Sequence, residues 1–402
     1  MIAANTAWIL SATALVLMMT LPGLALFYAG LVRAKNKISV FTACFGIAAL
    51  MSLCWVSFGY SIAFSQSSGI GAGYWGGLGN SFMIAVTKES IVGTIPENLF
   101  ALFQMTFAII TSALIVGAYV ERIKFSFVLA FSALWLLLCY APVTHWIWGG
   151  GFLSQKFATA DFAGGIVVHQ TAGIAALILA KMLGVRQGFP TRLSPPSSPL
   201  FVAIGAAMLW VGWFGFNAGS ALAADESAAQ AALVTHISAA AATCSWLLYD
   251  VLVRKGRATM IGAATGMVAG LACITPAAGV AGPAGALLLG LSAGVICNWM
   301  CNVVKDWWKI DDSLDVFAVH GVGGIWGTVL IPLVGSAAFG GSNETATFVG
   351  QIASLLIVGL FTAIVTFVLA YVLRAFIGMR VSRDDEAQGL DYALHGEMES
   401  KE

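Results

Sequence analysis

Charged residues are scarce in this chain of 402 residues, and so are the usual marks of a cofactor site. Only 9% of residues are charged, 59% are hydrophobic and the mean hydropathy is +0.90, which leaves too little polar surface for a water-soluble globule. No basic run is present and 19 basic residues balance 19 acidic ones, which argues against a nucleic-acid partner. The seven cysteines form no CxxC pair and no zinc spacing, so we expect core residues and no metal or other cofactor.

Long hydrophobic runs predict an all-α integral membrane protein instead. A helix needs about 20 apolar residues to span hydrocarbon. Eleven runs of roughly that size are present: Thr6–Val32, Ile38–Phe64, Leu99–Val120, Phe125–Tyr140, Phe162–Leu183, Leu200–Asn217, Ala228–Val253, Met260–Thr275, Ala281–Val304, Val316–Val334 and Phe348–Ile377. They are too continuously apolar for barrel strands. The first lacks a basic leader and is too long for a signal-peptide core, so we expect it to remain as a helix.

Basic residues alternate between the loops on the two sides of the predicted bundle. Seventeen of the 19 follow odd-numbered helices: Arg33, Lys35, Lys37, Arg122, Lys124, Lys181, Arg186, Arg192, Arg254, Lys255, Arg257, Lys305, Lys309, Arg374, Arg380, Arg383 and Lys401. Only Lys88 and Lys156 remain for the other side. Because Lys and Arg concentrate in cytoplasmic loops, we expect the N-terminus outside and the C-terminus inside.

Eleven helices divide into an inverted repeat of five plus five, with one C-terminal helix. The predicted membrane domain covers residues 1–377, with repeats at about 6–183 and 200–334 and helix 11 at about 348–377, and a cytoplasmic tail covers residues 378–402. His169 ends the stretch Asp161-Phe-Ala-Gly-Gly-Ile-Val-Val-His169, and His320 ends a partial echo of it, Asp315-Val-Phe-Ala-Val-His320. The histidines therefore occupy matching helices, 5 and 10, and inverted repeats often form a site at the membrane midplane.

An ionisable group inside an apolar span is a candidate functional residue. Gly165 and Gly173 share a helix face with His169, and Gly321 follows His320 directly, so the two helices can approach closely. The imidazoles would then meet edge to edge, with one N–H donating to the other ring, and the pair could hold one shared proton.

A structural role is the alternative for these histidines, in which each bonds a helix carbonyl and holds the bundle together. The three other histidines have no matching partner in the repeat. We expect His145 in an outer loop region, His236 in helix 7 and His395 in the tail. The tail itself is either a solvated segment or a regulatory surface.

Asp161 stands directly before helix 5, where its carboxylate can accept backbone N–H groups and complement the helix dipole. A carboxylate near the outer mouth would also attract an arriving cation. Aromatic residues gather in two further places, Phe103 with Phe107 on helix 3 and Trp213 with Phe216 and Ser220 around the outer end of helix 6. The orientation rule puts Trp148, which follows helix 4, and Ser220 on the same, external side. They predict either a small cation-binding cage or an ordinary aromatic belt with core packing.

Motifs along nearly the whole chain resemble one family. They are Pro22-Gly-Leu-Ala-Leu-Phe-Tyr-Ala-Gly30, Trp146-Ile-Trp-Gly-Gly-Gly151, Asp161-Phe-Ala-Gly-Gly-Ile-Val-Val-His169, Gly212-Trp-Phe-Gly-Phe-Asn-Ala-Gly-Ser220, Thr275-Pro276, Asp315-Val-Phe-Ala-Val-His320-Gly and Gly389-Leu-Asp391 with His395-Gly-Glu397. On these residues the chain resembles the ammonium transporter family, Amt of the Amt/Rh superfamily, in its proteobacterial form.

The resemblance implies a homotrimer in which each eleven-helix protomer has its own pore. An outer ammonium-recruitment site would comprise Trp148, Phe103, Phe107 and Ser220, with Asp161 as its supporting carboxylate. Phe107 and Phe216 would form a stacked gate. His169, His320 and Trp213 would line the hydrophobic conduction path.

In the tail the resemblance covers Gly389, Leu390, Asp391, His395, Gly396 and Glu397, although Gln388 stands where family members often have Glu. It implies a tail resting on the cytoplasmic face and control by trimeric PII signalling proteins. It also implies a multi-pass protein of the inner (plasma) membrane that carries ammonium or ammonia and methylammonium, and no enzyme.

The physics of ion passage favours one mechanism. Ammonium resembles potassium in size, but only ammonium can shed a proton and cross an apolar path as ammonia. Both electroneutral passage and passage accompanied by a proton along the histidines are compatible with the sequence. One rival is an ammonium sensor that acts through a bound cytoplasmic partner. Another is a metalloenzyme using His169, His320 and Asp161, which we disfavour because Asp161 would lie about 12 Å along helix 5 from its histidine.

Overall fold

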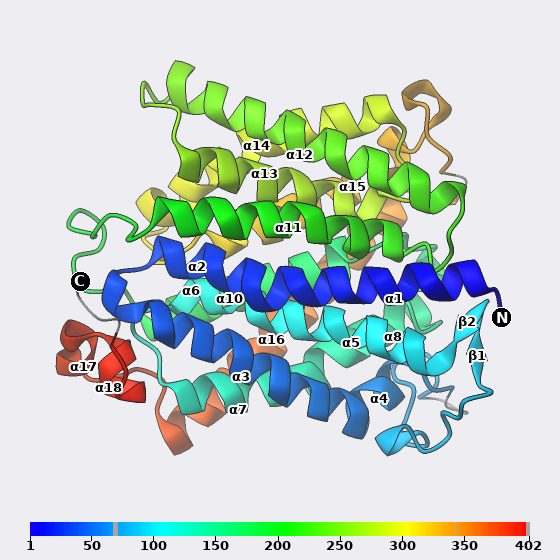
Figure 1. Cartoon of the computed structure of the whole chain (residues 1–402), viewed down its shortest axis with the longest axis horizontal. Coiled ribbons are helices and arrows are strands. Elements are labelled where there is room, and N and C mark those ends of the chain that lie inside the picture. The colour runs from blue at the N-terminus through cyan, green and yellow to red at the C-terminus, as the bar shows by residue number, and fades with distance from the viewer. Residues whose placement is uncertain (67–70, 344, 399–402) are drawn as a thin grey trace.

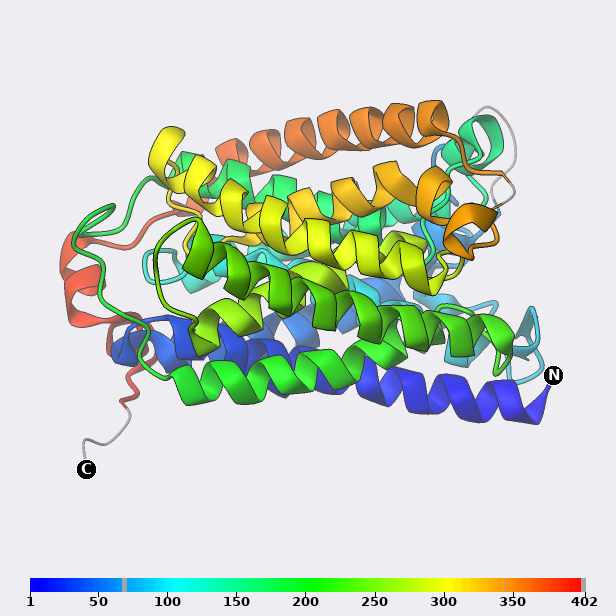
Figure 2. The same cartoon turned by 90° about the horizontal axis from the view of Figure 1, so that it is seen from above.

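The computed structural model describes residues 1–66, 71–343 and 345–398. Eleven helical spans in these residues are long and apolar enough to cross a membrane, which confirms the predicted number. Figure 1 shows the spans running along the long axis of the molecule, with the N-terminus at one end and the C-terminal tail at the other. Seen from above in Figure 2, α16 lies along one edge, and α1 and α11 lie along the opposite edge.

Most spans consist of one or more consecutive α-helices. In chain order the helices are α1 (Ala3–Met18), α2 (Ala25–Leu31), α3 (Lys37–Cys54), α4 (Tyr60–Phe64), α5 (Glu97–Leu114), α6 (Val116–Tyr119), α7 (Phe125–Trp135), α8 (Ala141–Ile147), α9 (Phe152–Phe157), α10 (Thr171–Leu183), α11 (Pro199–Gly219), α12 (Glu226–Leu252), α13 (Met260–Ile274), α14 (Pro283–Asn302), α15 (Val322–Val334) and α16 (Phe348–Ile377). A short antiparallel hairpin, β1 (Ile91–Val92) and β2 (Ile95–Pro96), precedes α5 near the N-terminal end of the bundle.

Among the described residues, wider π-helical turns interrupt, open or end six of the spans. They cover Met19–Leu24, Trp55–Gly59, Leu136–Tyr140, Gly165–Gln170, Val303–Trp307 and Phe317–Gly321. π-Helical turns are uncommon and frequently occur at functional sites. Two of the six carry the candidate histidines, His169 and His320.

The fourth span is longer than the sequence indicated, and this corrects the expected position of one histidine. The predicted run ended at Tyr140, but the π-helical turn there leads directly into α8 and the span continues to Phe157. His145 therefore lies buried in α8 and not in an outer loop. Its two ring nitrogens lie 3.0 and 2.9 Å from the carbonyl oxygens of Ala63 and Ala72. The ring thus connects α8 to the end of α4 and to the loop that follows it.

The tail folds back onto the bundle, which argues against a solvated segment for its described part. Two short helices, α17 (Arg383–Gln388) and α18 (Leu390–His395), lie at the end of the molecule opposite the N-terminus (Figure 1). Helix α17 begins at a capping box of Ser382 and Asp385. Glu386 and Leu390 are buried, so the tail forms part of the packed structure.

Candidate functional site

Glycines bring the two candidate histidines together. A Cβ atom at Gly173 would overlap the backbone of Gly321, and one at Gly324 would lie 2.7 Å from the Cβ of His169. The helices that carry His169 and His320 can therefore approach only because these positions lack side chains. The two ring centroids lie 5.2 Å apart, with the ring planes 25° from parallel.

The histidines meet as expected, but the expected bond between them is not made. Within the described part of the chain, neither ring nitrogen of His169 has a hydrogen-bond partner, and Nδ1 of His320 has none either. Both side chains are almost fully buried. Buried nitrogens without protein partners are rare, and they leave this pair able to bond a small polar molecule.

A cavity of about 300 Å³ is walled by residues of α4, α5 and α8 and of the segment after α11. Figure 1 shows α4 and α8 at the end of the bundle where the N-terminus lies. The wall of this cavity consists of Phe64, Phe100, Gln104, Phe107, Ile147, Trp148, Phe162, Ser220 and Leu222. The hydroxyl of Ser220 donates to the carbonyl oxygen of Phe216 at 2.9 Å, which leaves its lone pairs to accept. The indole N–H of Trp148 donates to the carbonyl oxygen of Asp161 at 2.7 Å and fixes the orientation of the ring.

Stacked rings connect this cavity to the histidines. Phe107 lies edge-on to Trp148 at 6.0 Å and stacks on Phe216 at 4.2 Å, with the two phenyl planes 20° from parallel. Phe216 in turn lies 6.0 Å from His169. Trp213 flanks the same imidazole at 5.6 Å. The rings thus form a file from the cavity wall to the histidine pair.

Phe103, a residue of the predicted recruitment site, lies behind the cavity wall. Phe103 is fully buried, and its ring lies edge-on to Phe107 at 5.0 Å. It therefore supports the wall, whereas Phe100 and Gln104 from the same helix line it. The sequence prediction missed both of these residues. Their positions i+4 and i+7 along α5, from Phe100 to Gln104 and Phe107, were the available signal.

The carboxylate of Asp161 caps the histidine-bearing helix and does not face the cavity. Its two oxygens accept the backbone N–H groups of Gly164, Gly165, Ile166 and Val167 at 2.6 to 3.0 Å. Burial raises the pKa of this carboxyl to about 6, although the four N–H groups favour the charged form. The residue therefore fixes the start of the helix and, through its carbonyl oxygen, the ring of Trp148.

Asp312 is the counterpart of Asp161 in the second half of the chain, and the sequence prediction missed it. The partial repeat of the Asp161–His169 stretch begins at Asp315, which is five residues before His320. Asp312 stands eight residues before His320, the same spacing as from Asp161 to His169. One of its oxygens accepts the N–H of Phe317 at 2.7 Å. Burial and the neighbouring Asp315 raise its pKa to about 6.

A second cavity of about 250 Å³ lies at the tail end of the bundle. Its wall includes Arg186, Thr265, Lys305, Ser313 and Asp315. Lys305 and Asp315 form an ion pair of 2.6 Å on this wall. Among the described residues, the wall of the first cavity carries no charged side chain, whereas the wall of the second carries three, so the two ends of the bundle differ.

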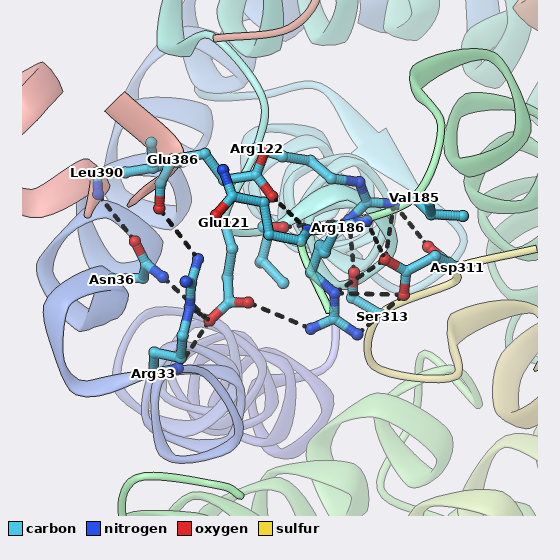
Figure 3. A network of polar contacts seen from close by, with 12 residues as sticks. Arg33, Asn36, Glu121, Arg122, Val185, Arg186, Asp311, Ser313, Glu386 and Leu390 are labelled. Carbon is cyan, nitrogen blue, oxygen red and sulfur yellow. Dashed lines mark hydrogen bonds and ion pairs between the residues drawn. The ribbon is translucent and has the colours of Figure 1, made fainter. Parts of the chain in front are cut away.

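A network of charged residues, drawn in Figure 3, joins the tail to this second end. Glu121 accepts from the backbone N–H of Arg33 at 2.8 Å and from Asn36 at 3.0 Å, and it pairs with Arg186 at 3.4 Å. Arg186 then pairs with Asp311 at 2.9 Å. Burial disfavours the charged form of Glu121, but Arg186 and Arg33 outweigh it and hold the pKa of this carboxyl below its ordinary value.

The tail residues singled out in the sequence contact the first loop of the bundle. The backbone N–H of Leu390 donates to the side chain of Asn36 at 2.8 Å, and the carboxylate of Asp391 accepts the N–H of Ser39 at 2.7 Å. Gly389 has φ of +108° and packs against Lys35, where a side chain would clash.

The end of α18 also contacts the bundle. His395 lies edge-on to Phe125 at 5.3 Å. Gly396 ends the helix with φ of +69°, and the N–H of Glu397 donates back to the carbonyl oxygen of Asp391 at 3.2 Å. The side chain of Glu397 itself is exposed.

An apolar file of rings leads from a cavity at one end of eleven membrane spans to a buried histidine pair, which is an arrangement typical of a membrane transport protein. Residues 7–400 match the Ammonium Transporter Family. The chain therefore belongs to the ammonium transporter family, which consists of membrane transport proteins and not enzymes.

Two curated relatives and two solved structures are similar over almost their whole length. The putative ammonium transporter of Methanothermobacter thermautotrophicus is 46% identical, over 98% of this chain and 97% of that relative. The ammonium transporter of Bacillus subtilis is 40% identical over the same shares. The crystal structure of Saccharomyces cerevisiae Mep2 has a TM-score of 0.84 at 32% identity, covering 94% of this chain and 90% of that one. A sensor Amt protein has a TM-score of 0.88 at 27% identity, covering 98% of each chain.

Proposed function

We propose that this protein transports ammonium, and methylammonium, across the membrane by separating the cation from one proton. The cation binds in the cavity walled by Trp148 and Ser220 and loses a proton at the stacked pair of Phe107 and Phe216. One N–H bond breaks, the electron pair stays on nitrogen, and the proton passes to water on the outer side. Ammonia then crosses beside the histidines.

The unbroken file of rings from the cavity to His169 is the observation that carries this proposal. Moving a bare unit charge into such surroundings costs on the order of 20 kcal/mol in the idealised limit. A cation–π contact returns only about 0.5–2 kcal/mol. A few ring faces therefore cannot carry a permanent cation through, whereas neutral ammonia needs no such compensation.

Uptake of labelled methylammonium into proteoliposomes tests the proposal. Unlabelled ammonium should compete, whereas a large excess of potassium should not. Strong competition by potassium would defeat the deprotonation scheme. Voltage-clamp currents of His169→Ala and His320→Ala, compared with those of the wild-type protein, test the histidines as a proton route. Selective currents that survived both changes would exclude the pair from that role.

We infer that the tail regulates transport from the cytoplasmic side, where a trimeric PII-type signalling protein is the proposed partner. Because Lys and Arg concentrate in cytoplasmic loops, we expect the tail on the cytoplasmic side and the cavity walled by Trp148 and Ser220 on the outer side. The docked position of Asp391 and the charged network reaching Asp311, next to Asp312, support this proposal. Asp391→Ala should alter uptake, whereas Asp384→Ala in the exposed part of the tail should not. Equal uptake by the two variants would argue against regulation through the docked tail.

A polar surface residue supports the proposed homotrimer in the plasma membrane. His236 is exposed near the middle of α12, where an isolated protomer would present it to hydrocarbon. Contact with a second copy would remove that exposure. Native mass spectrometry of the purified protein should show three copies, and a monomer would contradict the assembly.

A sensor that acts through a bound cytoplasmic partner is the rival function. The structural similarity to a sensor Amt protein is the observation that favours this alternative. Restored growth of a transporter-deficient strain on limiting ammonium is expected of a transporter. A sensor would bind ammonium without restoring growth.

A further inference from the structure

The motif Thr275-Pro276 has no part in the proposed function, yet the structure places it beside the ring of Trp213. Thr275 follows α13 directly and is fully buried. Its hydroxyl oxygen accepts the indole N–H of Trp213 at 2.9 Å. The ring of Trp213 in turn lies 5.6 Å from that of His169. A threonine hydroxyl therefore holds the single polar atom of the tryptophan that flanks the histidine pair.

Hydrogen bonds continue from Thr275 across the bundle. Its O–H lies 2.7 Å from the carbonyl oxygen of Leu271 and 3.2 Å from the side-chain oxygen of Asn217, and either oxygen can accept it. The amide of Asn217 donates to the hydroxyl of Thr235 on α12 at 2.9 Å. Thr275, Asn217 and Thr235 are all fully buried. This chain of bonds ties α11, which carries Trp213, to α12 and to the end of α13.

The segment that contains Thr275 is also fixed to the helix that carries His169. The carbonyl oxygen of Pro276 accepts the backbone N–H of Phe162 at 3.1 Å. A Cβ atom at Gly165 would overlap the ring of Pro276, so the two segments pack in direct contact. Because Thr275 precedes Pro276, its hydroxyl fixes the indole relative to the helix of His169.

The indole of Trp213 occupies a confined place between the proposed gate and the histidines. Its ring lies 5.4 Å from that of Phe216, with the planes 48° apart, and its plane is 21° from that of His169. The residue is buried, so a rotation of the ring would press it against one of these neighbours. We propose that Thr275 is a positioning residue for conduction, whose hydroxyl holds the indole of Trp213 clear of the path beside His169.

Removal of this hydroxyl would leave the indole N–H as a buried donor without an acceptor. Such a donor is unfavourable, which drives the ring to turn towards another acceptor. Neither ring nitrogen of His169 has a hydrogen-bond partner among the described residues, and a neutral imidazole accepts at one of them. The displaced indole would occupy that nitrogen and narrow the path. This inference rests on the proposed function, in which ammonia crosses beside His169.

Thr275→Val keeps the shape of the side chain and removes its hydroxyl. The Vmax of methylammonium uptake into proteoliposomes should fall by roughly tenfold, the factor that corresponds to one lost buried hydrogen bond. The KM should stay close to the wild-type value, because the wall of the outer cavity includes neither Thr275 nor Trp213 among its described residues. Thr275→Ser keeps the hydroxyl and should retain uptake. Thr275→Ala removes the same oxygen and takes the place of the valine variant should that variant fail to fold.

The matched control is Thr366→Val. Thr366 accepts the indole N–H of Trp135 at 3.0 Å, and both side chains are fully buried. The ring of Trp135 stacks on Phe131 within α7, so this pair has the same chemistry with a different neighbour. The control variant should lose stability and keep the wild-type Vmax per folded protein. A fall in Vmax as large as that of Thr275→Val would overturn the inference, because lost stability alone would then explain both.

A double substitution tests whether Thr275 acts through Trp213. Trp213→Phe removes the indole N–H, so adding Thr275→Val should cause no further fall in Vmax. An equal fall in the presence and absence of the indole would assign Thr275 a different role and overturn the inference.

Ultraviolet resonance Raman spectra provide a readout that does not depend on uptake, because they respond to hydrogen bonding of the indole N–H. Subtraction of the Trp213→Phe spectrum from the wild-type spectrum isolates the signal of Trp213. That signal should shift in Thr275→Val and stay in place in Thr275→Ser. A signal that is unchanged in Thr275→Val would overturn the inference. If the wild-type protein takes up no methylammonium, the proposed function fails instead, and the Raman shift still tests the bond.

Discussion

The cap made by Asp161 is the most sharply testable structural element of the site. Asp161→Asn keeps the size of the side chain but replaces one oxygen with an NH2 group. The remaining oxygen can serve two of the four N–H groups that the carboxylate now accepts. The other two backbone N–H groups would face the new NH2 group, which is itself a donor, and would lose their acceptor.

The loss of stability expected for Asp161→Asn follows from the number of hydrogen bonds that the substitution removes. A buried backbone donor left without a partner costs about 1–3 kcal/mol, so two such donors should cost about 2–6 kcal/mol. Asp225 provides the matched control, because it caps α12 through a single bond to the N–H of Ala228 at 3.1 Å. Asn and Asp cap exposed helix ends almost equally well, so Asp225→Asn should cost less than about 1 kcal/mol.

Unfolding of both variants in detergent micelles, followed by tryptophan fluorescence, measures this difference. We expect Asp161→Asn to unfold at clearly lower denaturant than Asp225→Asn. Uptake should also fall in Asp161→Asn, since the capped helix carries His169 and the Asp161 backbone holds Trp148. Equal unfolding midpoints for the two variants would refute the reasoning.

Two further predictions concern close packing and charge. Gly173→Ala should destabilise the protein by about 1–3 kcal/mol and lower uptake, because the added methyl group meets the backbone of Gly321; wild-type unfolding and uptake would contradict this. Glu121→Gln should lower the melting temperature at pH 7 by breaking the contacts to Arg33 and Arg186. Since the folded pKa of Glu121 is lowered, this stabilisation is present above the ordinary carboxyl pKa and is lost as pH falls through the folded value. The difference between Glu121→Gln and wild type should therefore persist to about pH 4.5, and a difference that vanished near pH 6 would contradict it.

The meeting of the histidines was predictable, but their geometry was not. Glycines at positions 165, 173 and 321 indicated a close helix crossing from the sequence alone. The predicted bond between the rings depends on the separation and angle of two helices, and those are fixed by contacts all along both helices. At a centroid distance of 5.2 Å, the nitrogens of His169 have no hydrogen-bond partner among the described residues.

Residues that act through long-range contacts were the ones missed. Gln104 looks like an ordinary polar residue in an apolar helix until the cavity wall is known. The sequence analysis did not single out Glu121 or Asp311, which Arg186 joins across the bundle. Asp315 resembles Asp161 in the residue types that follow it, whereas Asp312 resembles Asp161 in its spacing of eight residues from the histidine. The sequence analysis compared residue types and therefore selected Asp315.

Hydrophobic run length by itself determined the class of the protein and its eleven spans, because a helix in lipid must satisfy its own backbone locally. The family motifs were not needed for that conclusion, and neither was any contact between helices. Only the tertiary structure decided which side chains face a cavity, which cap a helix and whether the tail is docked. Those properties depend on groups far apart in the chain, whose distances no local pattern of residues can fix.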